Sequence, residues 1–218
     1  MAIVAGNPAR VIRKIDKYNV MNELEKCMAG EAYDCHDSVF LEMKAVATRW
    51  MLRYNTLPYD QRAQRYAMLQ ELFGHVGSNC SVGDGFICGF GCNIYLGNNV
   101  SVNYRCTLID CNTIRIGSNV LIAPGVQINT ASHPADWEDR RNPDFDSNPA
   151  SYFCKTYARP VVIGDNCWIG AGAIILGGVT LGDNVTVAAG AVVTKSFTGD
   201  CLIGGVPARV LRRFRSGK

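Results

Sequence analysis

From Val76 onward, an aliphatic residue recurs at every sixth position of the chain. We call this recurring position the aliphatic slot of the hexads. Its first members are Val76, Val82 and, as an exception, Cys88. It continues with Leu96, Val102, Leu108, Ile116, Ile122 and Ile128 and, after a gap, with Ile163, Ile169, Ile175, Leu181, Val187 and Val193. The next position is often Gly, and the fifth position of each hexad is usually small. A β-sandwich would instead alternate polar and apolar residues, so the period predicts a stack of very short strands.

Three hexads make one 18-residue coil with three flat faces, in which the aliphatic slot points inward and glycines allow tight corners. The predicted coils start at Val76, Leu96, Ile116, Ile163 and Leu181. Two coils carry two extra residues each, because Leu96 follows Cys88 by eight positions and Ile116 follows Leu108 by eight. Stacked about 4.8 Å apart, five coils form a prism about 24 Å tall, which is a parallel β-helix.

Three stretches before the hexads have helical spacing, namely residues 22–34, 37–57 and 59–73, and Asp60 is a candidate N-cap for the third. Solenoids need capped ends, so we expect residues 21–75 to form a helical cap. Residues 76–204 form the β-helix, interrupted by a loop at 134–162, and residues 205–218 form a basic C-terminal segment. Residues 1–20 are an extra segment of uncertain status that parallels the chain's own C-terminal LIGGVPARVLRRF.

The composition fits a globular protein of 218 residues, with 48% hydrophobic and 19% charged residues. A net charge of +3 is too small to favour nucleic acid or a membrane surface as a partner. We find no apolar run near the length of about 18 that spans a membrane, and no signal peptide. Four of the ten cysteines (Cys80, Cys92, Cys106 and Cys167) fill the small slot of the hexads. They therefore indicate free thiols and a cytoplasmic location, and no cysteine spacing is typical of a zinc site.

Seven motifs together resemble the maltose and galactoside O-acetyltransferase family, over about Asn22 to Phe214. They are KCMAGEAYD, RYNTLPYDQRAQRYAMLQELFGHVGSN, VNYRCTLID, INTASHPAD, VVIGDNCWIGAGAIILGGVTLGDN, AGAVVTK and GGVPARVLRR. The resemblance implies a left-handed parallel β-helix that transfers an acetyl group from acetyl-CoA to a sugar hydroxyl without a metal. It also implies a homotrimer with active sites between neighbouring prisms. Exposed flat faces on a lone prism independently favour oligomerisation.

His133 fills the last slot of its hexad, directly before the 29-residue loop of Pro134 to Val162. From the residues alone it is either a corner residue bonded to the loop or a general base. An imidazole that titrates near about 6.5 can accept the proton of a hydroxyl at neutral pH. The resemblance places the catalytic base here, with direct transfer and no covalent enzyme intermediate. The second ring nitrogen then needs an acceptor to hold it.

Four residues are candidates for the acceptor side of this site. Asn103 matches the family position that helps stabilise the oxyanion; otherwise it is a solvent-facing corner residue. Asp110 matches a position lining the acceptor pocket, but a turn-forming Asp is an equal alternative. Cys111 and Gly89 stand where sugar-binding members carry polar residues, which leaves the identity of the acceptor open.

For acetyl-CoA, the family uses the positions of Ala171 and Ala189 beside the pantetheine arm, although both also fit plain coil packing. Thr194 and Lys195 match its TK pair, and Arg209 and Arg212 match its phosphate-contacting arginines. Trp168 either lines the acetyl or acceptor site or packs against neighbouring residues. The loop, with Trp137 to Arg141 and PDFDSNPASYFC, is longer than in typical members, so we expect it to shape the acceptor pocket or to reach a neighbouring chain.

Three rival functions are compatible with a β-helix. The acceptor of an acetyltransferase could be an antibiotic, a chitooligosaccharide or a polysaccharide sugar. A β-helical carbonic anhydrase needs three histidine ligands, whereas only His133 lies within the coils, with His75 at their edge and His36 in the cap. A non-enzymatic ice-binding or scaffold β-helix would show continuous threonine ladders, which the threonines of this chain do not form.

Overall fold

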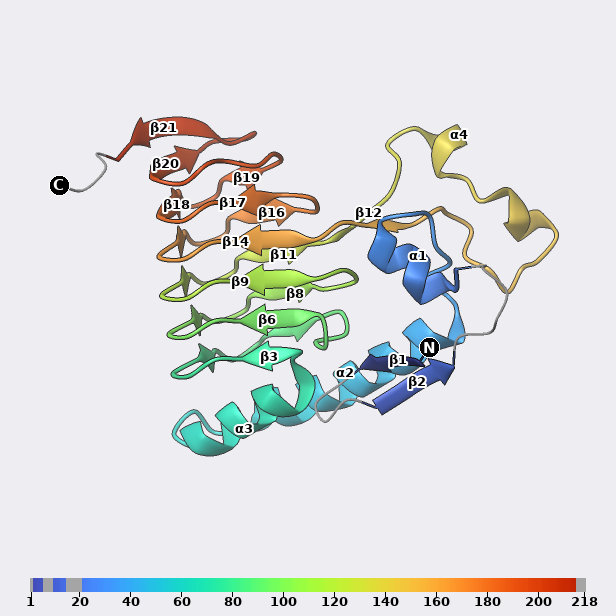
Figure 1. The fold of residues 1–218 in the computed structure, drawn as a ribbon, viewed down its shortest axis with the longest axis horizontal. Coiled ribbons are helices and arrows are strands. Elements are labelled where there is room, and N and C mark those ends of the chain that lie inside the picture. Colours follow the sequence, from blue (N-terminus) through green and yellow to red (C-terminus); the bar gives the residue numbers. More distant parts are fainter. Residues whose placement is uncertain (1, 6–9, 15–20, 215–218) are drawn as a thin grey trace.

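The computed structural model describes residues 2–5, 10–14 and 21–214 and contains a prism of three sheets (Figure 1). Sheet 1 stacks β3 (His75–Val76), β6 (Ile94–Leu96), β9 (Ile114–Ile116), β14 (Val161–Ile163) and β17 (Thr180–Leu181). Sheet 2 stacks β4 (Ser81–Val82), β7 (Ser101–Val102), β10 (Leu121–Ile122), β15 (Trp168–Ile169), β18 (Val185–Val187), β20 (Cys201–Gly204) and β21 (Arg209–Arg213). Sheet 3 stacks β5 (Ile87–Cys88), β8 (Thr107–Ile109), β11 (Gln127–Asn129), β16 (Ile174–Leu176) and β19 (Val192–Val193). The predicted parallel β-helix is confirmed.

The strand register confirms the two enlarged coils. In the lower coils, paired residues are 20 positions apart, as in His75 with Tyr95, whereas between the two coils after the loop they are 18 apart, as in Val162 with Thr180. Within the three sheets of the prism neighbouring strands are parallel, except that β21 runs antiparallel to β20. The extra residues therefore fall at one corner of the prism, where the chain passes from sheet 3 to sheet 1.

The aliphatic slot of the hexads fills the interior of the prism, and its side chains are buried. Cys80, Cys106 and Cys167 are buried in the small slot, as predicted, and all ten cysteines are free thiols. Cys92 differs, because it lies in an enlarged corner and packs, half-buried, against a separate core under the cap. The two extra residues displace it from the stacked slot.

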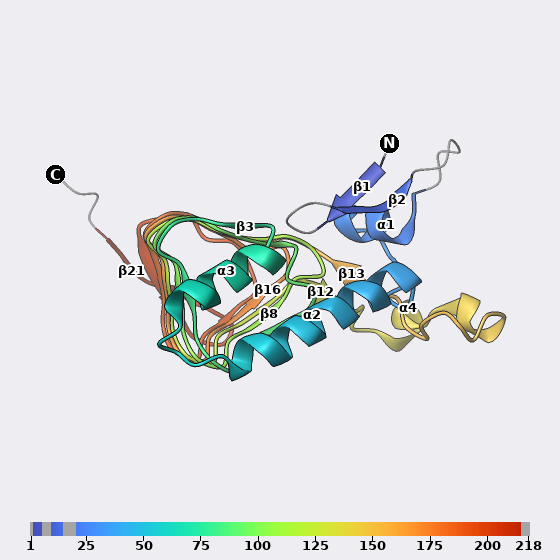
Figure 2. The same cartoon turned by 90° about the horizontal axis from the view of Figure 1, so that it is seen from below.

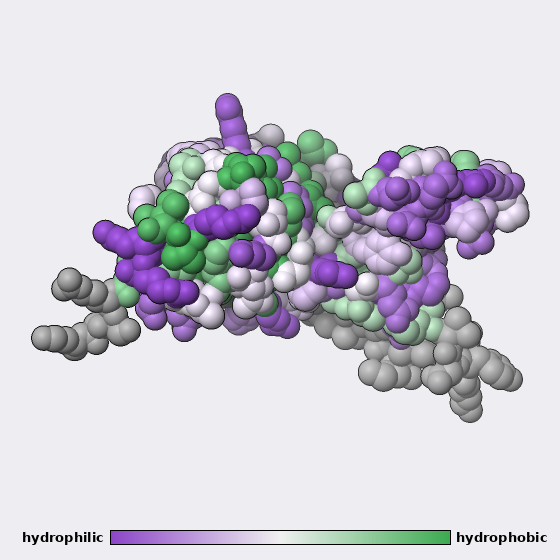
Figure 3. Space-filling model, turned by 90° about the horizontal axis from the view of Figure 1, so that it is seen from above, coloured by the Kyte–Doolittle hydropathy of each residue, from purple (hydrophilic) through white to green (hydrophobic). Residues whose placement is uncertain are grey.

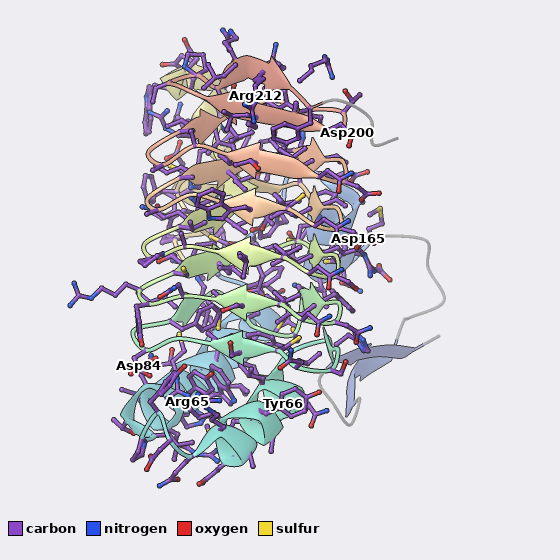
Figure 4. All side chains as sticks on the ribbon, turned by 90° about the vertical axis from the view of Figure 1, so that its left-hand side faces the viewer. Arg65, Tyr66, Asp84, Asp165, Asp200 and Arg212 are labelled. Atoms are coloured by element: carbon purple, nitrogen blue, oxygen red, sulfur yellow. The ribbon has the colours of Figure 1, made fainter. Side chains whose placement is uncertain are left out.

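A ladder of asparagines closes the corner between sheets 1 and 2. Each side-chain amide donates to the next coil, through Asn79, Asn99, Asn119, Asn166, Asn184 and finally Asp200, at donor–acceptor distances of 2.8–3.1 Å. All six residues have φ between 55° and 59°, a left-handed conformation that Asn and Asp tolerate better than most residues. Asp165 and Asp200 mark this edge of the prism in Figure 4. The repeated Asn thus supplies both the turn and the bond between coils.

Three helices confirm the predicted cap: α1 (Glu23–Ala29), α2 (Ser38–Thr56) and α3 (Arg62–Leu72). Helices α2 and α3 lie across the first coil (Figure 2). The Arg65 guanidinium from α3 donates to the carbonyl of Val82 at 3.0 Å and pairs with the Asp84 carboxylate at 2.8 Å (Figure 4). The prediction of Asp60 as the N-cap is wrong: α3 begins after Gln61, which makes no side-chain cap bond, and Asp60 contributes only its carbonyl.

The loop after coil three leaves the prism on the side where α1 packs (Figure 1). Its two ends pair as antiparallel strands β12 (Ala131–Ser132) and β13 (Tyr157–Ala158), and it carries α4 (Trp137–Arg140) and a 3-10 turn at Pro143–Asp146. The prism resumes at Val161, two residues before the predicted return.

The predicted extra segment contains β1 (Ala2–Ala5) and β2 (Arg10–Lys14), which form an antiparallel hairpin; its other residues lie outside those described. Among the described residues, every helix is too short or too polar to cross a membrane.

Candidate active site

The His133 ring lies just beyond β12, and its Nδ1 is 2.9 Å from the carbonyl oxygen of Lys155. A carbonyl only accepts hydrogen bonds, so Nδ1 carries the proton and donates. The lone pair therefore sits on Nε2, and the side chain is exposed. This tautomer is the one that a general base requires, and Lys155 supplies the acceptor that the sequence could not identify.

Backbone pairing across the loop holds the Lys155 carbonyl in place. Lys155 N–H donates to the carbonyl of Arg140 at 2.7 Å, and Asn142 N–H donates to that of Phe153 at 3.0 Å. The Arg140 guanidinium donates to the carbonyls of Pro134 and Ala135 at 2.9 and 2.8 Å. The residues that follow His133 are thus tied to the segment that fixes its ring, so the imidazole is pre-oriented.

His133 and Asn103 occupy different corners of the prism. Asn103 lies where sheet 2 passes to sheet 3, at the corner that also holds Ala171 and Ala189. His133 follows sheet 3, at the corner where the chain turns toward sheet 1. Because sheet 3 lies between the two corners, one chain does not bring the predicted base and the predicted oxyanion donor together.

The Asn103 amide is oriented within its own corner. Its Oδ1 accepts the Tyr104 N–H at 2.8 Å, and within the described part of the chain no hydrogen bond engages its Nδ2. The amide NH₂ is therefore the group left to donate. That is the polarity an oxyanion needs, and the oxyanion role itself stays a prediction.

The Asp110 carboxylate is fully buried and bonded to backbone. Its Oδ1 accepts the N–H of Phe90 at 2.8 Å and its Oδ2 accepts that of Asn93 at 3.1 Å. Burial raises the pKa of Asp110, and these backbone donors oppose the rise. At Gly89, an added Cβ would lie 3.2 Å from Asp110 Oδ1. Asp110 thus joins the two enlarged corners, which agrees with the turn-forming alternative; acceptor binding by Asp110 and Gly89 stays a prediction.

Cys111 lies half-buried in the second enlarged corner, beside the cap. Its carbonyl accepts the Cys27 thiol at 3.2 Å. Burial raises the pKa of Cys111 to about 11 and that of Cys27 to about 12. Both groups are therefore neutral thiols at physiological pH. Cys111 thus offers a weakly polar thiol at a position where a carboxylate would hydrogen-bond to sugar hydroxyls.

Ala171 and Ala189 are exposed at the corner between sheets 2 and 3, where they form a narrow column of small residues. Gly190 N–H donates to the Ala171 carbonyl at 2.8 Å, and a Cβ on Gly170 would lie 2.6 Å from Ala189 N. Only glycine fits at position 170, so the coils approach closely here. The Ala171 carbonyl is engaged between coils, and binding of pantetheine at Ala171 and Ala189 stays a prediction.

The other residues predicted to bind acetyl-CoA lie at separate places on the prism. Arg209 pairs with Gly204 at the top of the Ala171–Ala189 column, and Arg212 pairs with Leu202 on sheet 2 (Figure 4). Thr194 and Lys195 follow β19 at the His133 corner and are exposed. Trp168 lies on the outer face of sheet 2, 55% exposed, next to Leu121. A single chain therefore does not collect the whole predicted acetyl-CoA set.

Three residues near His133 were not found from the sequence: Asp34, His36 and Tyr152. They come together through a contact between the cap and the loop that spans 118 positions. Neither segment has a period that would signal this contact. In the described residues, no group of three or more His, Cys, Asp or Glu side chains could hold a metal ion.

Comparisons with known proteins agree with this architecture. Residues 26–77 match the maltose acetyltransferase hexapeptide capping motif, and residues 160–195 match the hexapeptide repeat of succinyl-transferase. Nodulation protein L of Rhizobium meliloti (strain 1021) is 41% identical over 186 residues, which cover 85% of this chain and 96% of that protein.

Two solved structures extend the likeness to the whole fold. The maltose O-acetyltransferase from Clostridium difficile 630 is 37% identical with a TM-score of 0.83, covering 91% of this chain and 100% of that one. A galactoside acetyltransferase in complex with coenzyme A is 32% identical with a TM-score of 0.81, covering 90% and 92%.

A hexad prism under this helical cap, with a carbonyl-oriented histidine at the loop, defines a hexapeptide-repeat acyltransferase. Within that class, the chain belongs to the maltose and galactoside O-acetyltransferase family.

Proposed function

We propose that this enzyme transfers the acetyl group of acetyl-CoA to a hydroxyl of a sugar, with His133 as the general base. The bond from His133 Nδ1 to the Lys155 carbonyl carries the proposal, because it leaves Nε2 as the basic atom at an exposed position. The likeness to acetyltransferases named for maltose and galactosides, one of them bound to coenzyme A, supports the donor and the class of acceptor.

In the proposed reaction His133 Nε2 takes the proton of the acceptor hydroxyl while its oxygen attacks the thioester carbonyl. A C–O bond forms, and the carbonyl oxygen becomes an oxyanion that accepts from the Asn103 amide. The C–S bond then breaks, and the imidazolium returns its proton to the departing thiolate of CoA. The products are the O-acetyl sugar and free CoA, with no covalent enzyme intermediate.

The proposed active unit is a homotrimer, because one chain separates the two halves of the site. Apolar side chains are exposed on sheets 2 and 3 around the Asn103 corner: Leu121 at 56%, Trp168 at 55% and Ile87 at 49%. Exposed apolar side chains gathered in this way are typical of subunit interfaces. In a closed ring, each Asn103 corner meets the His133 corner of the next chain.

Replacing His133 tests the mechanism. We expect His133→Ala to lower the rate of acetyl transfer by at least about 100-fold, since a general base contributes about that much or more. Binding of acetyl-CoA, measured by calorimetry, and trimer mass, measured by ultracentrifugation, should stay at wild-type values. His133→Gln is the matched control, because its amide keeps the bond to Lys155 and lacks a base. Turnover near the wild-type level in either variant would refute the mechanism.

A further inference from the structure

One carboxylate oxygen joins the cap to the long loop beside His133. Asp34 Oδ1 accepts the N–H of His36 at 2.9 Å and the N–H of Tyr152 at 3.2 Å. Asp34 is itself held, because its N–H donates to Glu23 Oε2 at 2.6 Å. Two segments 118 positions apart are thereby fixed to a single atom.

This junction places three rings in a row. The centroids of His36 and Tyr152 are 4.5 Å apart, and those of Tyr152 and His133 are 6.5 Å apart. The carbonyl of Tyr152 accepts the Asn142 amide at 2.8 Å, so its backbone is held on both sides. His36 and His133 are exposed and Tyr152 is half-buried, so the row presents an aromatic surface that leads to the catalytic ring.

We propose that Tyr152 and His36 form a wall of the acceptor site, on which the ring of a pyranoside stacks while its hydroxyl meets His133 Nε2. Asp34 is the positioning residue for this wall. The inference rests on the function proposed above and adds Tyr152 and His36 as residues that bind the acceptor.

The side chains around His133 favour stacking of the sugar ring over binding of its hydroxyls by a carboxylate. The Asp110 carboxylate is turned inward onto backbone donors, and Cys111 is a neutral thiol. A pyranose offers a face of C–H groups, which packs on an aromatic ring, and a rim of hydroxyls. Sites of this kind combine aromatic walls with a few polar groups that set orientation.

The test compares two acceptors with the same hydroxyl chemistry. Methyl β-galactopyranoside has a ring face, and galactitol is the open-chain polyol without one. We expect Tyr152→Ala to raise KM for the pyranoside about 5- to 10-fold, the range expected for loss of an aromatic stacking partner. The kcat and the KM for acetyl-CoA should change less than about twofold, since neither depends on the wall. Activity toward galactitol should be weak in the wild type and unchanged in the variant.

Two variants serve as controls and one as a second probe. Tyr152→Phe keeps the ring, and Tyr59→Ala removes an exposed aromatic between α2 and α3, outside the loop, so both should keep the wild-type KM. His36→Ala changes an exposed residue and should raise KM in the same direction even where Tyr152→Ala unfolds the loop. Equal KM values for Tyr152→Ala and wild type, or an equal rise in Tyr59→Ala, would overturn the proposal.

Calorimetric binding of methyl β-galactopyranoside separates this inference from the proposed function. If the wild type binds the pyranoside but transfers no acetyl group to it, the proposed function is refuted. The proposed wall is then still supported, provided that Tyr152→Ala weakens this binding. A wild type that transfers acetyl equally well to galactitol and to the pyranoside keeps the function and refutes the wall.

Discussion

The separation of His133 and Asn103 onto two corners predicts that two inactive variants restore each other. In the proposed trimer each site takes its base from one chain and its oxyanion donor from the next. His133→Ala and Asn103→Ala subunits, co-expressed with different tags and purified as mixed trimers, should therefore contain some sites with both wild-type residues.

The expected recovery follows from counting sites in a ring. A mixed trimer holds two subunits of one kind and one of the other, so one of its three sites combines a wild-type base with a wild-type donor, and about one third of the sites are intact. Each parent trimer has none. Acetyl transfer should thus rise from the low level of the parents to about one third of the wild-type level, at an unchanged KM for acetyl-CoA.

The assay needs trimers that are shown to be mixed. Free thiol released from acetyl-CoA reports turnover, and native mass spectrometry reports the subunit ratio. Mixing purified parents without subunit exchange is the control and should give no recovery. Mixed trimers as inactive as their parents would show that the two side chains act within one chain or not together, and the corner argument would then be wrong.

Two further predictions concern the prism and its thiols. Asn119→Ala should lower the free energy of unfolding by about 1–3 kcal/mol, because alanine loses both ladder bonds and is strained in the left-handed conformation. Asn119→Gly should lower it less, because glycine adopts the same φ without strain. Equal losses of stability for the two variants in urea unfolding would contradict this. Burial raises the pKa of Cys111 to about 11, so its thiol in the native protein should react with iodoacetamide at pH 8 about 100-fold more slowly than in the unfolded protein. The rate of labelling, followed by mass spectrometry, should increase as the pH rises. Labelling as fast as in the unfolded chain would refute the burial argument.

The loop and cap show where local patterns stop being informative. Asp60 looked like an N-cap because it precedes a helical stretch, yet the helix begins one residue later, after Gln61. Cys92 shared its hexad slot with buried cysteines, but the two extra residues of the coil move it to the second core. In both cases, the local residue types fit the prediction and the path of the backbone decided otherwise.

The sequence by itself determined the β-helix, its five coils, the two enlarged corners and the place of His133 at the loop. Each hexad carries this information independently, because burial of one residue in six is a local requirement repeated along the chain. Only the tertiary structure decided that Asn103 lies on another corner, that Asp110 turns inward, that Lys155 and Tyr152 lie beside the His133 ring, and that His36 lies beside Tyr152. These contacts join residues 20 to 118 positions apart through segments without a period, so they depend on how the cap meets the loop.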